Sequence, residues 1–401
     1  ERVPQGEGER QGEMGTEEQN PKIIIPEEWS MAANRITKDS TVSPPSKVLI
    51  CGPKNAGKTT FSRHLLNTLL SRFKKVAYLD TDVGQTEFTP PGLVSLTIVD
   101  KITGDLTIPC LKTPQRSFFF GDISSKRAPA TYTNHIFALY HFYKEEYCMF
   151  NKRENHSKAE VPLIVNTPGW VKGNGYSTLL QLIEKIVPTH IVKVNIPVLC
   201  KNLPPGPFWI NGDSDGTKTL IEIDSVCRDS FNRSVLARKD ARFLREMRII
   251  AYFRQCIPSS VNIPTVKELA HELASHPPYK ISMSCITIRH LHCQVPRSEI
   301  FYSLNATIVG LTISSEDSEL PQCVGLGIVR GVDASKELLY VITPILCAAL
   351  EKVDLLLQGF IQIPACLLQV AGCMSPYISA NALSLQNAVK ISNSNSTGSD
   401  R

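Results

Sequence analysis

The sequence predicts an α/β fold with a parallel sheet, followed by a smaller β-rich domain, and three observations lead to this prediction. The apolar run KVLIC at residues 47–51 is typical of a buried strand, and residues 58–71 repeat apolar side chains at helical spacing. A second strand, residues 74–80, follows and ends in an acidic residue. This order of strand, helix and strand indicates a parallel sheet covered by helices. Beyond about residue 280, short β-rich runs alternate with turn residues, as in a small antiparallel domain.

Residues 1–46 precede the first strand. Residues 1–20 hold six Glu against two Arg and have little apolar content, so we expect them to be disordered. Residues 21–46 should form a short helix that begins near Pro26, followed by the linker TKDSTVSPPS. The chain begins with Glu and shows no basic segment followed by an apolar one, and we interpret it as a fragment whose upstream part is missing.

Residues 47–258 are predicted to form the core domain. The further elements expected in it are strands at 162–166 and 190–194, helices near 133–147 and 176–187, and a basic helix at 238–253. Residues 280–386 should form the β-rich domain, and the Ser/Asn-rich residues 387–401 a solvated tail. With 401 residues, of which 42% are hydrophobic, the chain is long enough for two such domains.

The composition of the chain argues against a membrane-spanning protein and against one held together by disulfides. No stretch approaches about 18 uninterrupted apolar residues, so no membrane span is expected. The twelve cysteines include no C-x-x-C pair, which favours a reducing compartment. The net charge of +5 is compatible with an acidic partner such as a nucleic acid, although charge alone does not identify one.

The segment GPKNAGKT, Gly52 to Thr59, matches the P-loop (Walker A) pattern G-x-x-x-x-G-K-[ST]. Its glycines allow successive backbone N–H groups to face a phosphate, and the following helix adds its positive N-terminal end. Lys58 would reach the β- and γ-phosphates, and the Thr59 hydroxyl would bind Mg²⁺. The alternative is a glycine-rich turn, but the strand before the motif and the helix after it argue against that. The predicted nucleotide-binding residues are Gly52, Pro53, Lys54, Asn55, Ala56, Gly57, Lys58, Thr59 and Thr60.

The segment DTDVGQ, Asp80 to Gln85, ends the second strand. A carboxylate at the carboxyl end of a parallel strand beside a P-loop is where a nucleotide-bound Mg²⁺ or an acceptor hydroxyl would lie. Either Asp80 or Asp82 could supply it, and each taken alone could instead be a solvated strand end. Gln85 and Glu87 continue this acidic loop.

The segment VNTPGW, Val165 to Trp170, follows another apolar strand and should lie at the same edge of the sheet. Its T-P-G resembles the D-T-P-G element of GTPases, but Asn166 stands in place of the aspartate, and a GTPase fits poorly. Trp170 could offer a flat face to a nucleic-acid base. The alternative, that Trp170 packs in the core, stays open on the sequence alone.

Four arginines, Arg238, Arg242, Arg245 and Arg248, recur at spacings of three and four on the predicted basic helix, so several share a face. Such a face could close over a nucleotide and stabilise charge on a phosphoryl group during transfer. The alternative, which the sequence leaves equally open, is that this charged face of the helix is simply exposed to solvent.

The ordered set of G-P-K-x-x-G-K-T, D-x-D-x-G-Q, T-P-G-W and the arginine helix resembles the polynucleotide 5′-hydroxyl kinases. The closer resemblance is to the nucleolar branch that acts in pre-ribosomal RNA processing, which is related to the cleavage-factor RNA 5′-kinases. It extends from about Lys47 to Phe253. The resemblance implies a P-loop kinase core between an N-terminal domain, here expected to be truncated, and a C-terminal β domain.

The resemblance also implies transfer of the γ-phosphate of ATP, with Mg²⁺, to the 5′-hydroxyl of RNA or DNA. Lys58, Asp82, Arg242 and Arg245 would be catalytic, with the two arginines forming a lid. Asp82 would polarise the 5′-hydroxyl and, with Thr59, contact the metal. The residues assigned to the substrate's terminal nucleotide are Gln85, Thr167, Pro168, Gly169 and Trp170, the last four forming a clasp.

The partners implied by the resemblance are RNA 5′ ends, single- or double-stranded, and an endoribonuclease of pre-rRNA processing, and the implied location is the nucleus and nucleolus. A second hypothesis is a nucleotide-binding scaffold that assembles an RNA-processing complex with a nuclease. A third is a GTPase or metal-insertion ATPase of the same P-loop class, which would hydrolyse nucleotide without an acceptor hydroxyl.

Overall fold

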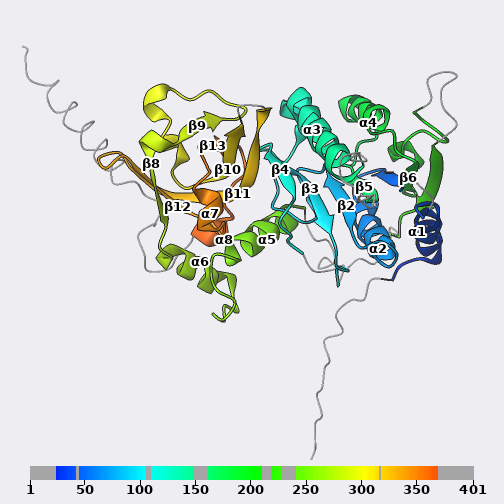
Figure 1. The fold of residues 1–401 in the computed structure, drawn as a ribbon, viewed down its shortest axis with the longest axis horizontal. Helices are drawn as coiled ribbons and strands as arrows, with labels where there is room; N and C mark the ends of the chain where they lie inside the picture. The colour runs from blue at the N-terminus through cyan, green and yellow to red at the C-terminus, as the bar shows by residue number, and fades with distance from the viewer. Residues whose placement is uncertain are drawn as a thin grey trace, which may run out of the picture.

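The computed structural model describes residues 24–41, 45–104, 110–148, 161–209, 218–226, 241–315 and 318–368. The predicted disorder at residues 1–20 and the predicted tail at residues 387–401 lie outside these ranges. Figure 1 shows two regions side by side, a helix-covered sheet built from the first half of the chain and a second sheet built from the last third.

The first sheet consists of β1 (Lys47–Cys51), β2 (Val76–Asp80), β3 (Leu93–Val99), β4 (Arg116–Phe119), β5 (Leu163–Asn166), β6 (His190–Asn195) and β7 (Thr219–Asp224). Their order across the sheet is β4-β3-β2-β5-β1-β6-β7. β2, β5, β1, β6 and β7 are parallel, whereas β3 and β4 add an antiparallel pair at one edge.

Helices cover both faces of this sheet, as expected for a sheet with parallel central strands. α1 (Glu27–Asp39) and α2 (Lys58–Leu70) pack on one face, and α3 (Pro129–Tyr147) and α4 (Gly173–Ile186) on the other (Figure 1). Side chains of β1 alternate between the two cores: Val48 and Ile50 face α1 and α2, while Leu49 and Cys51 face α3 and α4. All four are fully buried, which explains the continuous apolar run.

The α/β prediction is confirmed, and the predicted strands and helices of the core agree with the structure to within a few residues. β3, β4 and β7 were not predicted. β3 and β4 form no strand–helix–strand unit, and β7 is an edge strand with two exposed acidic residues, so it lacks a continuous apolar run. The predicted basic helix is described as α5 (Ala241–Arg254), and its expected start at residue 238 lies outside the described ranges.

The second sheet consists of β8 (Tyr279–Ser282), β9 (Thr287–His290), β10 (Thr307–Ser315), β11 (Ser318–Asp333), β12 (Leu338–Ile342) and β13 (Leu355–Gln358). Their order is β8-β12-β11-β10-β13-β9. All its pairs are antiparallel except β13 with β9, so the predicted antiparallel domain contains one parallel pair. Two short helices, α7 (Cys347–Leu350) and α8 (Ala365–Leu368), complete it.

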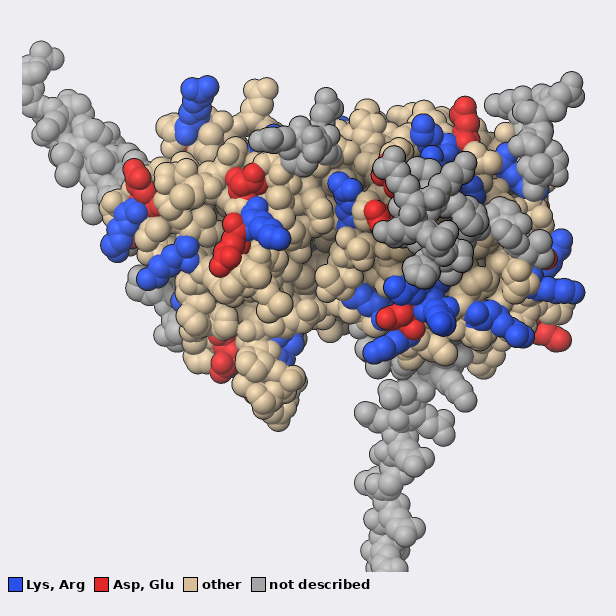
Figure 2. All heavy atoms as spheres, in the orientation of Figure 1, with Lys and Arg blue, Asp and Glu red and all other residues tan. Residues whose placement is uncertain are grey.

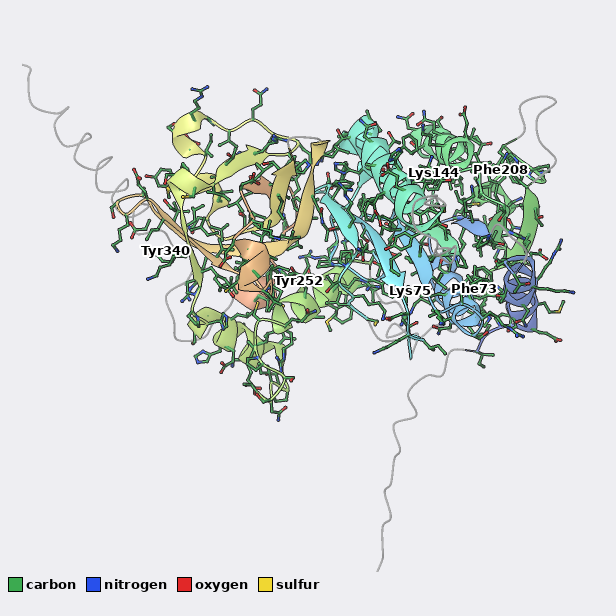
Figure 3. The ribbon with its side chains drawn as sticks, in the orientation of Figure 1. Phe73, Lys75, Lys144, Phe208, Tyr252 and Tyr340 are labelled. Atoms are coloured by element: carbon green, nitrogen blue, oxygen red, sulfur yellow. The ribbon has the colours of Figure 1, made fainter. Side chains whose placement is uncertain are left out.

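One hydrophobic core joins the two regions. Phe119 of β4 and Phe253 of α5 belong to the same buried cluster as Ile308 and Leu326 of the second sheet. The Tyr252 hydroxyl, seen beside the second sheet in Figure 3, accepts a hydrogen bond from the Leu326 N–H at 2.8 Å. α5 therefore packs against both regions, and α6 (Val266–Ser275) joins the same cluster through Leu273.

Within the described ranges, every helix is too short or too polar to cross a bilayer. On the face shown in Figure 2, Lys and Arg side chains gather over the lower part of the core domain, where Asp and Glu are fewer. This distribution agrees with the positive net charge of the chain.

Candidate active site

The three loop motifs start from one rung of the first sheet. Ile50 at the end of β1 lies in register with Asn166 of β5, and Asn166 lies in register with Asp80 of β2. The strands are parallel, so the P-loop, the acidic loop Asp80–Glu87 and the clasp Thr167–Trp170 all leave the sheet at the same edge. This rung brings together motifs that are far apart in the sequence.

The P-loop bends back over the end of β1 and leads into α2. Gly57 has φ of +95°, a conformation that suits glycine, and a Cβ there would lie 2.8 Å from the Trp29 ring of α1. Trp29 is almost fully buried, and its indole N–H donates to the Asp224 carbonyl at 2.9 Å. The α1 helix thus supports the P-loop from below, through a residue that no motif identified.

Lys58 is buried at the first position of α2, and its ammonium group donates to the Pro53 carbonyl at 2.7 Å. Burial lowers the pKa of Lys58 to about 8, while the nearby Asp82 carboxylate acts in the opposite direction. Thr59 and Thr60 follow in the first turn of the helix and are partly exposed. The loop therefore presents a cation and a helix N-terminus together, an arrangement suited to phosphate.

The two aspartates of the acidic loop have different environments. Asp80 is buried, and its carboxylate accepts hydrogen bonds from the backbone N–H groups of Asp82 and Glu87 and from the Asn166 amide at 3.1 Å. Burial raises the pKa of Asp80 to about 7, and the Asp82 charge adds to this rise while the hydrogen bonds oppose it. Asp80 is therefore committed to holding the loop.

Asp82 is partly exposed, and its Oδ1 accepts from the N–H groups of Gly84 and Gln85, both at 3.0 Å. No described residue hydrogen-bonds to its Oδ2. Between the two candidates, Asp82 is thus the carboxylate with an oxygen available to a ligand.

Asn166 has a structural role at this point. Its amide donates to Asp80, whereas an aspartate in its place would set a second carboxylate against a buried one. Asn166, which stands where GTPases have an aspartate, therefore helps to hold the acidic loop through its hydrogen bond to Asp80.

The clasp lies directly against the P-loop. The Thr167 hydroxyl donates to the Ile50 carbonyl at 2.8 Å. A Cβ on Gly169 would come within 2.5 Å of the Lys54 backbone N, so only glycine allows this approach. Trp170 is partly exposed and meets Tyr132 edge to face, with ring centroids 5.4 Å apart. One side of the indole packs on the core and the rest stays exposed. The two predictions for Trp170, packing in the core and a face open to a base, are therefore compatible.

The predicted lid arginines lie on α5. Arg242 is exposed, and its Nε pairs with Glu246 one turn along the helix at 2.8 Å. Arg245 is partly exposed, and Arg238 lies outside the described ranges. The residue of this helix that contacts the acidic loop is Arg248, which the resemblance did not assign.

Arg248 belongs to a buried ion cluster of three residues, which we call the Glu87 cluster. Its guanidinium donates to the Glu87 carbonyl at 2.6 Å and lies 3.7 Å from the Glu87 carboxylate, which also pairs with Arg63 of α2 at 2.9 Å. Burial raises the pKa of Glu87, and the two arginines oppose the rise. The cluster joins α2, the acidic loop and α5. Arg63 carries no sequence signal, because its role depends on packing.

Comparisons with known proteins identify the family of this chain. The family model described as the mRNA cleavage and polyadenylation factor CLP1 P-loop matches residues 52–204, and the model of the NOL9-like C-terminal domain matches residues 274–364. The polynucleotide 5′-hydroxyl-kinase NOL9 of Arabidopsis thaliana is 55% identical over 371 residues, which cover 92% of this chain and 99% of that protein.

The proteins of the same name from Homo sapiens and Danio rerio are 30% and 29% identical over 80% and 86% of this chain. The chain spans about half the length of these two vertebrate relatives, 50% of each. Among solved structures, wild-type Clp1p in complex with Pcf11p superposes with a TM-score of 0.59 at 17% identity, covering 83% of this chain and 78% of that chain. At this identity the superposition supports the fold alone.

The Glu87 cluster predicts a large effect on stability. Glu87→Ala would remove the carboxylate that pairs with the buried Arg63 and the half-buried Arg248, and we expect the free energy of unfolding to fall by about 3 kcal/mol. Urea denaturation measures this change. The matched control is Glu246→Ala, which removes the ion pair between Glu246 and Arg242, one turn apart on the surface of α5. It should change the free energy of unfolding by less than about 0.5 kcal/mol. Equal effects of the two substitutions would contradict a structural role for the cluster.

The lowered pKa of Lys58 predicts proton uptake when ATP binds. At about pH 8.5 a lysine with a pKa near 8 is mostly neutral in the free protein, and the phosphate charges raise that pKa, so binding should protonate Lys58. Calorimetric titrations in buffers of different ionisation enthalpy measure the uptake. Lys58→Arg should keep the charge and abolish the uptake, because a guanidinium stays protonated at this pH. Uptake unchanged in that variant would place the titrating group elsewhere.

Proposed function

The chain belongs to the NOL9-like polynucleotide 5′-hydroxyl-kinase family, and from this premise we propose that it transfers the γ-phosphate of ATP to the 5′-hydroxyl of RNA. The observation that supports this most strongly is the shared rung of Ile50, Asn166 and Asp80. From that rung a phosphate-binding loop, a loop with an available carboxylate and a loop with a partly exposed tryptophan leave the sheet together.

In this proposal the P-loop holds the triphosphate. Its backbone N–H groups and the N-terminus of α2 face the phosphates, and Lys58 reaches the β- and γ-phosphates. Burial lowers the pKa of Lys58 to about 8, and phosphate charge beside it would raise that pKa again, so Lys58 is fully charged once the nucleotide is bound. Phosphate charge is thus matched at the point of transfer.

The acceptor side consists of Asp82 and the clasp. Asp82 accepts the proton of the 5′-hydroxyl through its available oxygen, while Trp170 stacks on the terminal base and Gln85 borders the same nucleotide. Thr167, predicted to contact the substrate, is buried and instead holds the clasp to β1 through the Ile50 carbonyl. The hydroxyl oxygen then forms a bond to the γ-phosphorus as the bond from that phosphorus to the β-phosphate oxygen breaks. ADP leaves, and the proton stays on Asp82 until solvent removes it. Such a reaction needs chiefly positioning and charge stabilisation.

The residues that would hold Mg²⁺ are Thr59 and Asp82. A threonine hydroxyl is a hard oxygen ligand of the kind that Mg²⁺ takes, and Mg²⁺ usually keeps several bound waters. Thr59 would therefore contact the ion directly and Asp82 through a bound water, which leaves Asp82 Oδ2 for the 5′-hydroxyl. When bound, the ion would neutralise charge on the phosphate oxygens.

The lid is assigned to Arg242 and Arg245 of α5. Arg248 anchors that helix to Glu87 in the acidic loop, so the helix has a fixed base beside the site. With the nucleotide bound, Arg242 would exchange its exposed pair with Glu246 for the phosphoryl oxygens. An exposed pair of this kind contributes little, and its loss is a small cost.

We also propose that the protein acts in pre-rRNA processing and ribosome biogenesis with an endoribonuclease partner, in the nucleus and nucleolus. The support is the resemblance of the four motifs to the nucleolar branch of these kinases. Nuclear imaging of the tagged protein and purification of its complexes test this part. A tagged protein excluded from the nucleolus, or complexes without nuclease activity, would contradict it without affecting the proposed reaction.

The reaction predicts two loss-of-function variants. With γ-labelled ATP and a 5′-hydroxyl oligoribonucleotide, the protein should label the 5′ end. Lys58→Ala and Asp82→Ala should each reduce labelling by at least about 100-fold, because one removes charge at the phosphates and the other the group that takes the proton. Digestion of the product to mononucleotides locates the label.

Further variants test the residue assignment and separate this proposal from a nucleotide-binding scaffold. Asp80→Asn keeps the size of the buried side chain and an oxygen for the Asp82 and Asn166 donors, but loses the acceptor of the Glu87 N–H. It should lower stability and yet retain far more labelling than Asp82→Asn. If the Lys58→Ala protein labelled RNA as the unaltered protein does, the residue assignment would be wrong. If Lys58→Ala lost labelling but fully supported RNA processing in cells, the scaffold function would be favoured.

A further inference from the structure

A surface next to the candidate active site has features that the proposed reaction leaves unexplained. β4 and β2 are both antiparallel to β3, so they run in the same direction and end at the same edge of the sheet. The segment after β4, residues 121–127, therefore emerges beside the acidic loop, two strand spacings or about 10 Å from β2. The contact is direct, because a Cβ on Gly84 would lie 2.6 Å from the Ile123 carbonyl oxygen.

The second region of the protein completes this surface. The Phe360 N–H donates to the Gly121 carbonyl at 2.6 Å, and a Cβ on Gly359 would lie 2.2 Å from the same oxygen. His292 is joined to the Phe120 carbonyl at 2.8 Å, which places a ring proton on its Nε2. The Phe360 backbone bond and the His292 side-chain bond therefore hold the start of this segment against the loops that follow β13 and β9.

Three planar groups stack on this surface. The His292 and Phe360 rings lie 5.9 Å apart with an angle of 21° between their planes, and the Arg127 guanidinium carbon lies 4.7 Å from the centre of the Phe360 ring. Arg127 also donates from Nε to the Asp122 carboxylate at 2.8 Å. The guanidinium is thus held at one edge by a carboxylate and on one face by a ring, which fixes its plane.

Arg127, Phe360 and Ile123 leave a large part of their side chains exposed to solvent. Arg127 keeps 59% of its side chain exposed, and Phe360 and Ile123 are 42% and 44% exposed. A pre-ordered guanidinium plane, an aromatic ring and an aliphatic side chain at a partly exposed site form the kind of platform on which unpaired bases stack. Asp122 is buried and also accepts the Ser124 N–H, so Arg127 neutralises its charge and is held by it. This pairing accounts for the fixed edge of the guanidinium, and the exposed remainder of Arg127 with the exposed Phe360 and Ile123 is the part that a ligand could cover.

We propose that Ile123, Arg127 and Phe360 form a binding site for the second and third nucleotides of a single-stranded RNA 5′ end. The terminal nucleotide lies between Asp82 and Trp170 in the proposed function, on which this inference rests. The strand leaving it then passes over the residue 121–127 segment, whose contact with Gly84 makes the two surfaces continuous. The platform stacks on bases by their faces, so it favours an unpaired strand over a duplex and reads no sequence.

A series of acceptors of increasing length tests the proposal. The acceptors are a nucleoside 3′-monophosphate, which offers the terminal nucleotide alone, and a trinucleotide and a decanucleotide, all with a free 5′-hydroxyl. We expect Arg127→Ala and Phe360→Ala to lower kcat/KM for the two longer acceptors by at least about five-fold, the lower end for one stacked base. Both variants should leave kcat/KM for the nucleoside 3′-monophosphate unchanged.

Binding without ATP gives an independent readout. The affinity for a decanucleotide RNA labelled at its 3′ end should fall by a similar factor in both variants, measured by fluorescence anisotropy. Arg127→Lys keeps the charge and loses the plane, so its affinity should fall as well. The matched control is Lys185→Ala, which removes another exposed cation held over a ring, Phe137, at 5.9 Å, near the end of α4. It should bind and react normally.

The outcomes are separable. If the unaltered protein labels none of the acceptors, the proposed function fails. If it labels them and neither Phe360→Ala nor Arg127→Lys, which keeps a cation beside the buried Asp122, loses anything on the longer acceptors, the binding site is refuted while the kinase function stands. The surface would then fit a protein contact. A loss equal on all three acceptors would also refute the site, because it would place Arg127 at the terminal nucleotide.

Discussion

The candidate active site depends on the register of three parallel strands. β1, β5 and β2 meet at the rung of Ile50, Asn166 and Asp80, and side chains lock that rung from both directions. The Thr167 hydroxyl donates to the Ile50 carbonyl, and the Thr81 backbone and hydroxyl both donate to the Asn166 carbonyl. A shift of one residue in either pairing would turn buried side chains to the wrong face. Burial on both faces therefore fixes the positions of the three loops.

Burial also separates the roles of the two aspartates. Both follow β2, two residues apart, yet Asp80 is enclosed with three hydrogen-bond donors and Asp82 keeps one oxygen for a ligand. Burial raises the pKa of Asp80 to about 7, because it disfavours the charged form of the carboxylate. The three hydrogen-bond donors around Asp80 stabilise that charged form in part. Its hydrogen bonds to Asp80 fix the conformation of the acidic loop, and the fixed loop positions the Asp82 side chain. The Glu87 cluster extends the same rigidity to α2 and α5.

Local motifs carried most of the site prediction, and contacts between distant segments account for what was missed. The P-loop, the acidic loop and the clasp each follow an apolar strand, so their meeting at one edge could be inferred from parallel topology. The choice of Asp82 over Asp80 came from the family resemblance. Its physical reason, that Asn166 lies opposite Asp80 and helps to enclose it, depends on the pairing of two distant strands. Trp29 and Arg63 belong to no motif, and β3 and β4 pair antiparallel without a helix between them. Their positions follow from packing, which a single sequence does not display.

The central claim is that a 5′-hydroxyl meets the free oxygen of Asp82 at the strand ends beside Lys58. A crystal structure with a non-hydrolysable ATP analogue, Mg²⁺ and a 5′-hydroxyl trinucleotide tests it directly. We expect the 5′-oxygen within hydrogen-bond distance of Asp82 and in line with the γ-phosphate, with the terminal base against Trp170. A 5′-oxygen held by other residues, or a terminal base away from the clasp, would contradict the claim.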